Sequence, residues 1–295
     1  MEKKIIKTVA SYISYLEDMN IYTLATHESS LVTMFRGQAD ATWELIPSLY
    51  RDGLFTSERL YITELLQNCP NEFSDNRFNN LVKMQHFGLT TRLLDTTTNP
   101  LVALYFACSD DNYMNKTGAV YIFPDCFAKW SSDPEIEIIM DFIYDWHPHE
   151  HNISMLFEYL KNKHHSDKCS LFLEDEETLL RTLTKPTIAV TPAKSNPRID
   201  AQDGAFLLFG MKLMDMKGHE ICTIEGRNDW YFRPAKITDS NSLYDRIIKI
   251  TIPKNSKQRI LDSLNLLGIN ERSLFPDLSH QIHYTMETVK ATTAQ

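Results

Sequence analysis

The residue types best suited to chemistry are concentrated between residues 85 and 95. This stretch contains an amide, an imidazole, two hydroxyls, a guanidinium and a carboxylate, on Gln85, His86, Thr90, Thr91, Arg92 and Asp95. An imidazole titrates near neutral pH and transfers protons, and a guanidinium suits phosphates or carboxylates. The apolar segment 101–108 follows closely and has to be buried. Polar groups this dense beside a buried segment form either a hydrogen-bonded core network or a binding site.

Two further arginines are candidates for the same site. Arg36 lies near the end of a predicted strand, 31–37, where alternation places it on one face with two apolar side chains. A guanidinium among apolar neighbours needs an anion or several carbonyl groups nearby. Arg198 opens a second polar cluster, residues 198–202. Gln38 and Gln202 follow these arginines and are candidates for holding a sugar hydroxyl or an amide.

These polar residues allow two interpretations. If Arg36, Arg92 and Arg198 converge, they form a cationic pocket suited to a pyrophosphate or a carboxylate. In the alternative, each arginine pairs with a buried carboxylate, for which Asp95, Asp200 and Asp277 are the candidates. His86 is likewise either a proton-transfer group or a hydrogen-bonded residue at the end of a helix, and the two glutamines are either ligand-binding or structural.

The elements that must position these residues include both helices and strands. Apolar spacing and capping residues predict helices at about 4–18, 57–67, 77–87, 101–107 and 257–267. Alternation and short apolar runs predict strands at 31–37, 118–123, 187–191, 205–209 and 246–252. Gly88 suits the C-terminal cap of the helix that carries Gln85 and His86. We therefore predict an α+β fold, with a mixed or antiparallel sheet core wrapped by helices.

Residues 125–185 change in character, because helical patterns replace the strands. We interpret this region as a helical insertion into the core. Its helices are predicted to begin at Asp133-Pro134 and to cover about 152–161 and 174–183. Residues 1–29 are expected to contribute a helix packed on the core, and residues 286–295 a flexible tail.

Composition excludes several classes of protein. The chain has 295 residues and a formal net charge of −9, which argues against a general nucleic-acid coat, because such binding relies on neutralising phosphates. No apolar run reaches the length of a membrane span, and the first residues lack the apolar core of a signal peptide. The five cysteines are odd in number and lack a Cys-x-x-Cys pair, which suggests reduced thiols. We expect a cytoplasmic protein with no membrane partner.

Motif searches narrow the chemistry further. The chain contains no Gly-x-Gly-x-x-Gly, Walker or Gly-x-Ser-x-Gly sequence, which disfavours dinucleotide-fold, P-loop and serine-hydrolase interpretations. Histidines at 147, 149 and 151, with His164 and His165 further along, are capable of binding a metal. Pro148 breaks the helical spacing that would place two of them on one face, unlike His-Glu-x-x-His. We predict no functional metal.

Several of these segments together resemble the FRG domain family, named for its Phe-Arg-Gly motif. They are Phe35–Gln38, Gln85–Asp95, Asn99–Leu101, Ala103–Ala107, Arg198–Phe206 and Leu274–Leu278. The resemblance covers roughly residues 30–285 and is interrupted by the insertion. Thr96 departs from the pattern, since an aromatic residue is expected there, and the change would alter the wall of a pocket.

The resemblance implies a hypothesis about activity. An arginine late in an early strand, followed by glycine, is similar to the first strand of ADP-ribosyltransferases, where the arginine helps to hold NAD. On this analogy NAD is a substrate, with no metal, in a group-transfer enzyme, and the hypothesis includes a role as a toxin or phage-defence effector. The catalytic candidates are Arg36, His86 and Asp95. The candidates for binding NAD or a related nucleotide are Arg36, Gln38, Gln85, Thr91, Arg92, Arg198 and Gln202.

Two other classes of function stay open. The same pocket would serve a non-catalytic module that recognises a small anionic ligand or a partner's tail. In that case the insertion, with Trp130, Tyr144 and Trp146, would supply a surface for a protein partner. A nuclease or nucleic-acid binder ranks last, because neither metal-binding carboxylates nor a basic face is evident.

Overall fold

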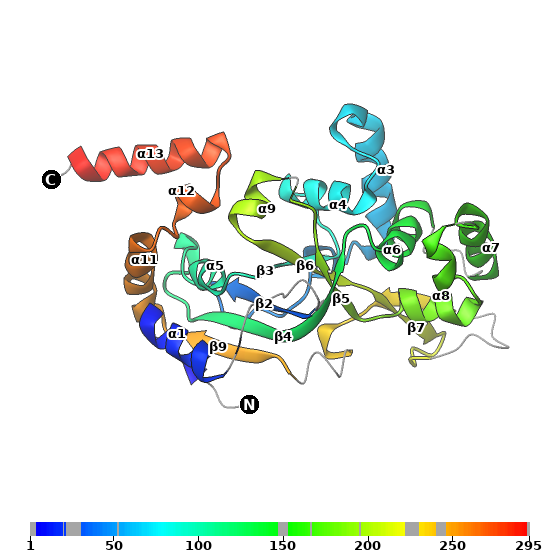
Figure 1. The fold of residues 1–295 in the computed structure, drawn as a ribbon, viewed down its shortest axis with the longest axis horizontal. Coiled ribbons are helices and arrows are strands. Elements are labelled where there is room, and N and C mark those ends of the chain that lie inside the picture. Colours follow the sequence, from blue (N-terminus) through cyan, green and yellow to red (C-terminus); the bar gives the residue numbers. More distant parts are fainter. Residues whose placement is uncertain are drawn as a thin grey trace.

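The computed structural model describes residues 4–19, 21, 31–51, 53–146, 153–165, 167–194, 196–221, 230–239 and 246–293 (Figure 1). Its main sheet contains β1 (Lys4–Ile5), β2 (Leu31–Gln38), β3 (Leu93–Thr97), β4 (Gly118–Trp130), β5 (Thr187–Thr191), β6 (Gly204–Phe209) and β9 (Ile248–Ile252). A separate two-stranded sheet pairs β7 (Met211–Asp215) with β8 (Trp230–Pro234). The α+β class predicted from the sequence is confirmed.

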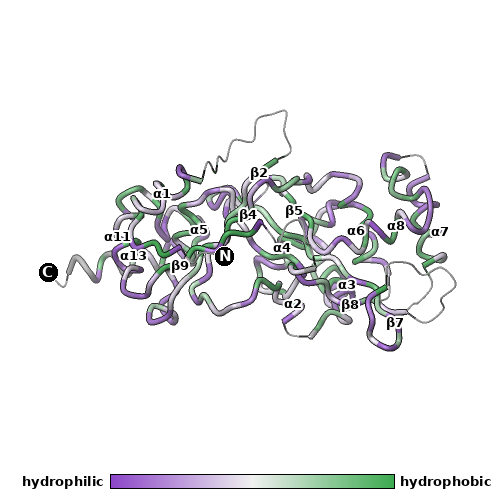
Figure 2. The backbone as a smooth tube through the Cα atoms, turned by 90° about the horizontal axis from the view of Figure 1, so that it is seen from below, coloured by the Kyte–Doolittle hydropathy of each residue, from purple (hydrophilic) through white to green (hydrophobic). Residues whose placement is uncertain are grey.

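The helices are α1 (Val9–Asp18), α2 (Ser48–Arg51), α3 (Glu58–Asn68), α4 (Arg77–His86), α5 (Pro100–Phe106), α6 (Pro134–Asp145), α7 (Ile153–Lys163), α8 (Glu176–Leu183), α9 (Pro197–Ala201), α11 (Lys257–Leu266), α12 (Glu271–Leu274) and α13 (Leu278–Thr293). They form two groups at opposite ends of an elongated molecule. Helices α6, α7 and α8 lie at one end, and α11 and α13 lie at the other (Figures 1 and 2).

The main sheet closes on itself. Its strand order is β1-β9-β4-β2-β3-β6-β5, and the far end of β4 also pairs with β5, so that β4, β2, β3, β6 and β5 form a ring. Antiparallel pairing holds most of this ring, but β2 and β3 share a single recorded pair, Phe35 with Thr97. The ring therefore has a seam between β2 and β3.

Alternation along the strands sorts their side chains into different cores. Met34, Leu94, Leu207 and their equivalents on β4 and β5 belong to one hydrophobic cluster, which draws on all five strands of the ring. The other face of β2, β4 and β9 packs on α1, α5 and α11. The other face of β3, β5 and β6 packs on α3, α4, α6, α7 and α8. The seam between β2 and β3 therefore lies between the helices that pack on β2 and those that pack on β3.

Several predicted boundaries were wrong. Residues 93–97, for which no strand was predicted, form strand β3, and β4 runs through Pro124 to Trp130, so the helices of the predicted insertion begin near residue 134. Lys4–Ile5 forms strand β1 against β9, ahead of helix α1. Residues 286–293 belong to α13 and not to an irregular tail. For β1, β3 and the end of β4, pairing partners distant in the sequence decide the local structure.

Helix α5 and the end of α4 follow their sequence signals closely. The side chain of Asn99 accepts hydrogen bonds from the backbone N–H groups of Leu101 and Val102, and Pro100 takes the first helical position. Gly88 has a φ of +99°. A positive φ is common for the residue that follows the end of a helix, and glycine adopts it readily. Among the described residues, no helix has both the length and the apolar character needed to cross a membrane.

Candidate anion-binding cavity

A cavity of about 240 Å³ lies at the seam between β2 and β3. Its walls come from β2, β3 and β6, from the end of α4 and from α9. The predicted site residues that line it are Arg36, Gln85, His86, Asp95, Arg198 and Gln202. The Asp95 side chain is 66% exposed, so this wall opens to solvent. Segments far apart in the sequence thus meet around one hollow, as the pocket interpretation requires.

The Phe-Arg-Gly sequence of β2 has a different physical task at each position. The side chain of Phe35 is fully buried against α5. Gly37 passes so close to α5 that a Cβ atom would lie 1.9 Å from the carbonyl oxygen of Ala103, a distance no side chain tolerates. Phe35 and Gly37 therefore fix β2 against α5, and this holds the Arg36 side chain at the seam.

Arg36 joins the two strands of the seam. Its Nη1 donates to the backbone carbonyl of Asp95 and lies 3.9 Å from Oδ2 of the same residue. Its Nε is buried and has no hydrogen-bond partner among the described residues. Burial lowers the pKa of the Arg36 guanidinium, and the Asp95 carboxylate opposes that shift. An arginine stays protonated under such a shift, so Arg36 brings a positive charge with unused donor capacity to the cavity.

Gln85 links the wall of the cavity to the loop behind it. Its Nε2 donates to Oδ1 of Asp95 at 2.7 Å, and its Oε1 accepts a hydrogen bond from the Thr91 hydroxyl. The Thr91 hydroxyl oxygen in turn accepts from the backbone N–H of Leu93 at 3.1 Å. This chain of hydrogen bonds fixes the orientation of the Asp95 carboxylate, which is the only acidic side chain lining the described part of the cavity.

His86 is held as a neutral imidazole that donates through Nε2. Oδ1 of Asn196 accepts from the backbone N–H of Arg198 at 2.8 Å, so its amide nitrogen is the atom 3.0 Å from Nδ1 of His86. Nδ1 is therefore an acceptor, and the ring proton lies on Nε2. Burial lowers the pKa of His86, and the nearby Arg198 cation lowers it further, although Asp277 opposes both. In this arrangement Nδ1 of His86 is occupied by Asn196, and Nε2–H is the ring group left to donate a hydrogen bond.

Arg198 supplies the second cation. Its guanidinium lies 4.7 Å from the centroid of the Phe275 ring, in a cation–π contact. Within the described part of the chain it makes no hydrogen bond and no ion pair. Burial lowers the pKa of Arg198, and Asp277 and Asp95 oppose the shift. Its donors are therefore directed to a ligand or to water.

The family model of the FRG domain matches residues 32–116. The protein contains an FRG domain. The matched region runs from β2 through α5 and includes Arg36, Gln85, His86 and Asp95. No curated protein and no solved structure matched the chain.

The FRG domain supplies only part of the cavity. Arg198 and Gln202 line the cavity but lie outside the matched region. Residues 274–278 lie outside it as well. Both segments resemble the family in sequence. The wider domain boundaries predicted from the sequence, residues 30–285, stay a prediction. The structure nevertheless places α9 and its arginine directly against the matched segment.

Three predicted ligand contacts lie away from the cavity. Both Arg92 and its partner Glu58 are buried, and Nε of Arg92 donates to the Glu58 carboxylate at 2.9 and 3.0 Å. Gln38 is buried and its Nε2 lies 3.5 Å from the carbonyl of Glu44. Thr91 is fully buried and acts through Gln85. Gln202 does line the cavity, but its Nε2 donates to the carbonyl of Leu274 at 3.0 Å.

For Arg92, the structural alternative is therefore correct, but with a carboxylate that the sequence did not single out. Glu58 begins α3, and nothing in its spacing from Arg92 predicts the contact. Asn196 was also missed as a partner of His86. Its position immediately before Pro197 is the signal of a helix cap, and the cap geometry is what orients its amide. Thr96, the departure from the family pattern, is among the lining residues, although its buried hydroxyl donates to Sδ of Met34.

Only one of the three aromatic residues predicted to form a surface for a protein partner is exposed. Trp130 is 62% exposed, whereas Tyr144 and Trp146 are buried and cannot contact a partner. Histidines 147, 149 and 151 lie outside the described residues.

Proposed function

We propose that the cavity binds the phosphate groups of a nucleotide of the NAD class and that the protein transfers a group from it. The observation that carries this proposal is the convergence of three donors from three elements on one hollow. Arg36 on β2, Arg198 on α9 and His86 at the end of α4 all line it. Guanidinium groups with unused donors in a partly buried site suit phosphate oxygens.

The size of the cavity limits how much of the ligand it holds. Its volume of about 240 Å³ is below the range of roughly 300–1,000 Å³ for sites that enclose a drug-sized ligand. A dinucleotide therefore places only one portion inside, which we assign to a phosphate and its neighbouring ribose. The rest of the ligand lies along the solvent-exposed side of Asp95.

Asp95 is the residue we assign to the reacting end of the ligand. Its carboxylate is exposed, yet it is oriented by Gln85 and lies near Arg36. Such a carboxylate accepts a hydrogen bond from a ribose hydroxyl or from an incoming nucleophile. In the proposed reaction the bond between nicotinamide and ribose breaks with its electron pair on nicotinamide. The nucleophile then forms the new bond to the ribose carbon and releases its proton to Asp95.

Isothermal titration with NAD tests the binding step. The wild-type protein should bind NAD, and Arg36→Ala should abolish the heat of binding. Arg181→Ala is a matched control, because Arg181 lies on the exposed face of α8 in the insertion. If neither NAD nor any other dinucleotide gave a heat of binding, the proposal would be wrong.

A second candidate, a non-catalytic module that recognises an anionic group, is favoured by one observation. The amide and carboxylate groups of the wall already have partners, since Gln85 is bonded at both ends and Gln202 is bonded to Leu274. Incubation with labelled NAD separates the two candidates. Release of nicotinamide that is lost in Asp95→Asn supports transfer, whereas binding without release supports recognition.

A growth test examines the role as a toxin or effector that the family resemblance suggests. If the protein acts as a toxin on cellular targets, its expression should arrest growth, and Arg36→Ala should relieve the arrest. Arrest that persists in Arg36→Ala, with the variant expressed at the wild-type level, would contradict that role.

A further inference from the structure

A second cluster of reactive side chains lies in the helical insertion, away from the seam. Glu137 comes from α6, His164 follows α7, and Cys169 belongs to a short 3-10 helix, Lys168–Phe172. One ligand atom from each of the three lies within 4.8 Å of the others. His164 and Cys169 are buried and Glu137 is exposed, so the cluster is closed on the protein side and accessible on the other.

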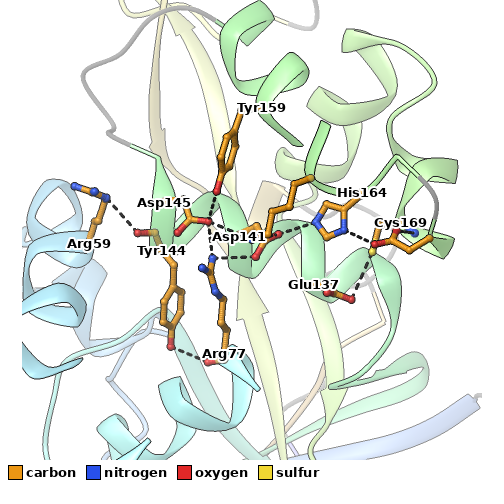
Figure 3. A network of polar contacts seen from close by, with 11 residues as sticks. Arg59, Arg77, Glu137, Asp141, Tyr144, Asp145, Tyr159, His164 and Cys169 are labelled. Atoms are coloured by element: carbon orange, nitrogen blue, oxygen red, sulfur yellow. Dashed lines mark hydrogen bonds and ion pairs between the residues drawn. The ribbon is translucent and has the colours of Figure 1, made fainter. Parts of the chain in front are cut away.

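The orientation of His164 is fixed by a buried carboxylate. Its Nε2 lies 2.7 Å from Oδ2 of Asp141, and its ring lies between Asp141 and Cys169 (Figure 3). Asp141 is itself held by Arg77 at 2.9 Å and by Lys163 at 2.8 Å. Histidines that bind metals usually donate their second ring N–H to a carboxylate, which fixes the tautomer and the ring orientation. Asp141 occupies that position here, and the other ring nitrogen, Nδ1, lies 2.7 Å from Oδ2 of Asp167.

Two ligand-to-ligand distances in the cluster are close to those around a tetrahedral ion. Sγ of Cys169 lies 3.5 Å from Oε2 of Glu137. Ligands at about 2.3 Å for sulfur and about 2.0 Å for oxygen, at tetrahedral angles, are separated by about 3.5 Å. Oδ2 of Asp167 lies 2.7 Å from Nδ1 of His164. Replacing the proton of that hydrogen bond by an ion requires the two atoms to separate by only about 0.6 Å.

We propose that Glu137, His164 and Cys169, with Asp167 as the fourth ligand, form a structural zinc site. The donor set selects the metal, because a thiolate and an imidazole suit Zn²⁺, whereas Mg²⁺ and Ca²⁺ prefer oxygen ligands alone. The ion binds through Nδ1 of His164, opposite the nitrogen that donates to Asp141. Four protein ligands leave no position for a substrate, so the role of the ion is structural.

The site connects separate segments of the insertion. Glu137 lies near the start of α6, and the other three ligands lie in the connection between α7 and α8. An ion bound by both segments adds its binding free energy to the folding of this region, because the unfolded chain does not hold the ligands together. Removal of the ion should therefore lower the thermal stability of the insertion.

Cobalt titration of the full chain tests the site. The protein is treated with a chelator, dialysed and titrated with Co²⁺, which reports a bound thiolate by a charge-transfer absorption band. We expect one Co²⁺ per chain with that band, displacement by Zn²⁺, and a higher melting temperature with Zn²⁺ than with the chelator. Cys169→Ser should lose the band, while the controls Cys69→Ser and His165→Ala should keep it. Cys69 and His165 are both exposed.

Glu137→Gln keeps the test decisive if Cys169→Ser fails to fold, because residue 137 is exposed on α6. This variant should fold as the wild type does and bind Co²⁺ about tenfold or more weakly. Wild-type affinity in Glu137→Gln, or a charge-transfer band that persists in folded Cys169→Ser, would overturn the assignment. Loss of binding in His149→Ala would also overturn it, since the metal would then belong to the histidine-rich segment at 147–151.

Discussion

The arginines at residues 36 and 92 lie in the same domain, yet they have opposite surroundings. Arg92 is buried next to α3, where the Glu58 carboxylate accepts from its Nε and Nη2 and neutralises its charge, while its buried Nη1 has no hydrogen-bond partner among the described residues. Arg36 lies at the seam, where a carboxylate oxygen of Asp95 is 3.9 Å away and its Nε has no hydrogen-bond partner in the part of the chain that the structure describes. The comparison shows that an arginine in a family motif is not by itself a ligand contact. What distinguishes the two arginines is whether a carboxylate of the protein already forms hydrogen bonds with the guanidinium.

The largest difference between the two arginines should appear in stability. Arg92→Ala leaves the Glu58 carboxylate buried without a partner, which should cost about 3–5 kcal/mol of the free energy of unfolding. Arg36→Ala removes a hydrogen bond to one carbonyl and should cost about 1–2 kcal/mol. Urea unfolding of both variants measures the two values, and equal losses would contradict the distinction.

A smaller effect is expected at the other cavity arginine. Arg198→Ala removes one of the two cations, so the affinity for NAD should fall by about tenfold or more, as loss of a charged hydrogen bond of 1.5–3 kcal/mol implies. Its cation–π contact with Phe275 is worth only about 0.5–1 kcal/mol, so the protein should stay folded. Titration calorimetry and a melting curve measure both quantities. Unchanged affinity would restrict the phosphate site to Arg36.

The smallest expected effect concerns the pKa of His86. Burial and the Arg198 cation hold that pKa below its ordinary value of 6.5, so Arg198→Ala should raise it. The folded protein binds this proton less readily than the unfolded chain does. The stability that neutral His86 contributes is therefore present above pH 6.5 and is lost as the pH falls from there toward the folded-state pKa. An NMR titration of the ring gives the value, and a pKa at or above 6.5 in the wild type would contradict the described contacts.

The sequence predicted those parts of the site that depend on neighbouring residues. The cap formed by Asn99 and Pro100, and the end of α4 before Gly88, follow from local capping rules, and these place His86 and Gln85 correctly. The convergence of Arg36 with Arg198 was predicted only as one of two alternatives. Which alternative applies to each arginine depends on Glu58 and Asp95, and side chains so far apart in sequence are brought together only by the folded chain.

Strand β3 shows the same limit in the backbone. Residues 93–97 are short and rich in polar side chains, so they resemble a turn when taken alone. Pairing with β6 along five residues makes them a strand. The weak pairing of β3 with β2 on its other side then creates the seam. Local propensity carries no information about either pairing partner.

One measurement tests the central claim most directly, namely the melting temperature of the wild type and of Arg36→Ala, each with and without NAD. A ligand at a hundred times its dissociation constant stabilises the folded state by about 2.7 kcal/mol. We predict a clear upward shift for the wild type, and no shift for Arg36→Ala, whose melting temperature without ligand is lower by only the few degrees that a loss of about 1–2 kcal/mol implies. A wild type that NAD does not stabilise, or an Arg36→Ala variant that NAD stabilises equally, would contradict the account.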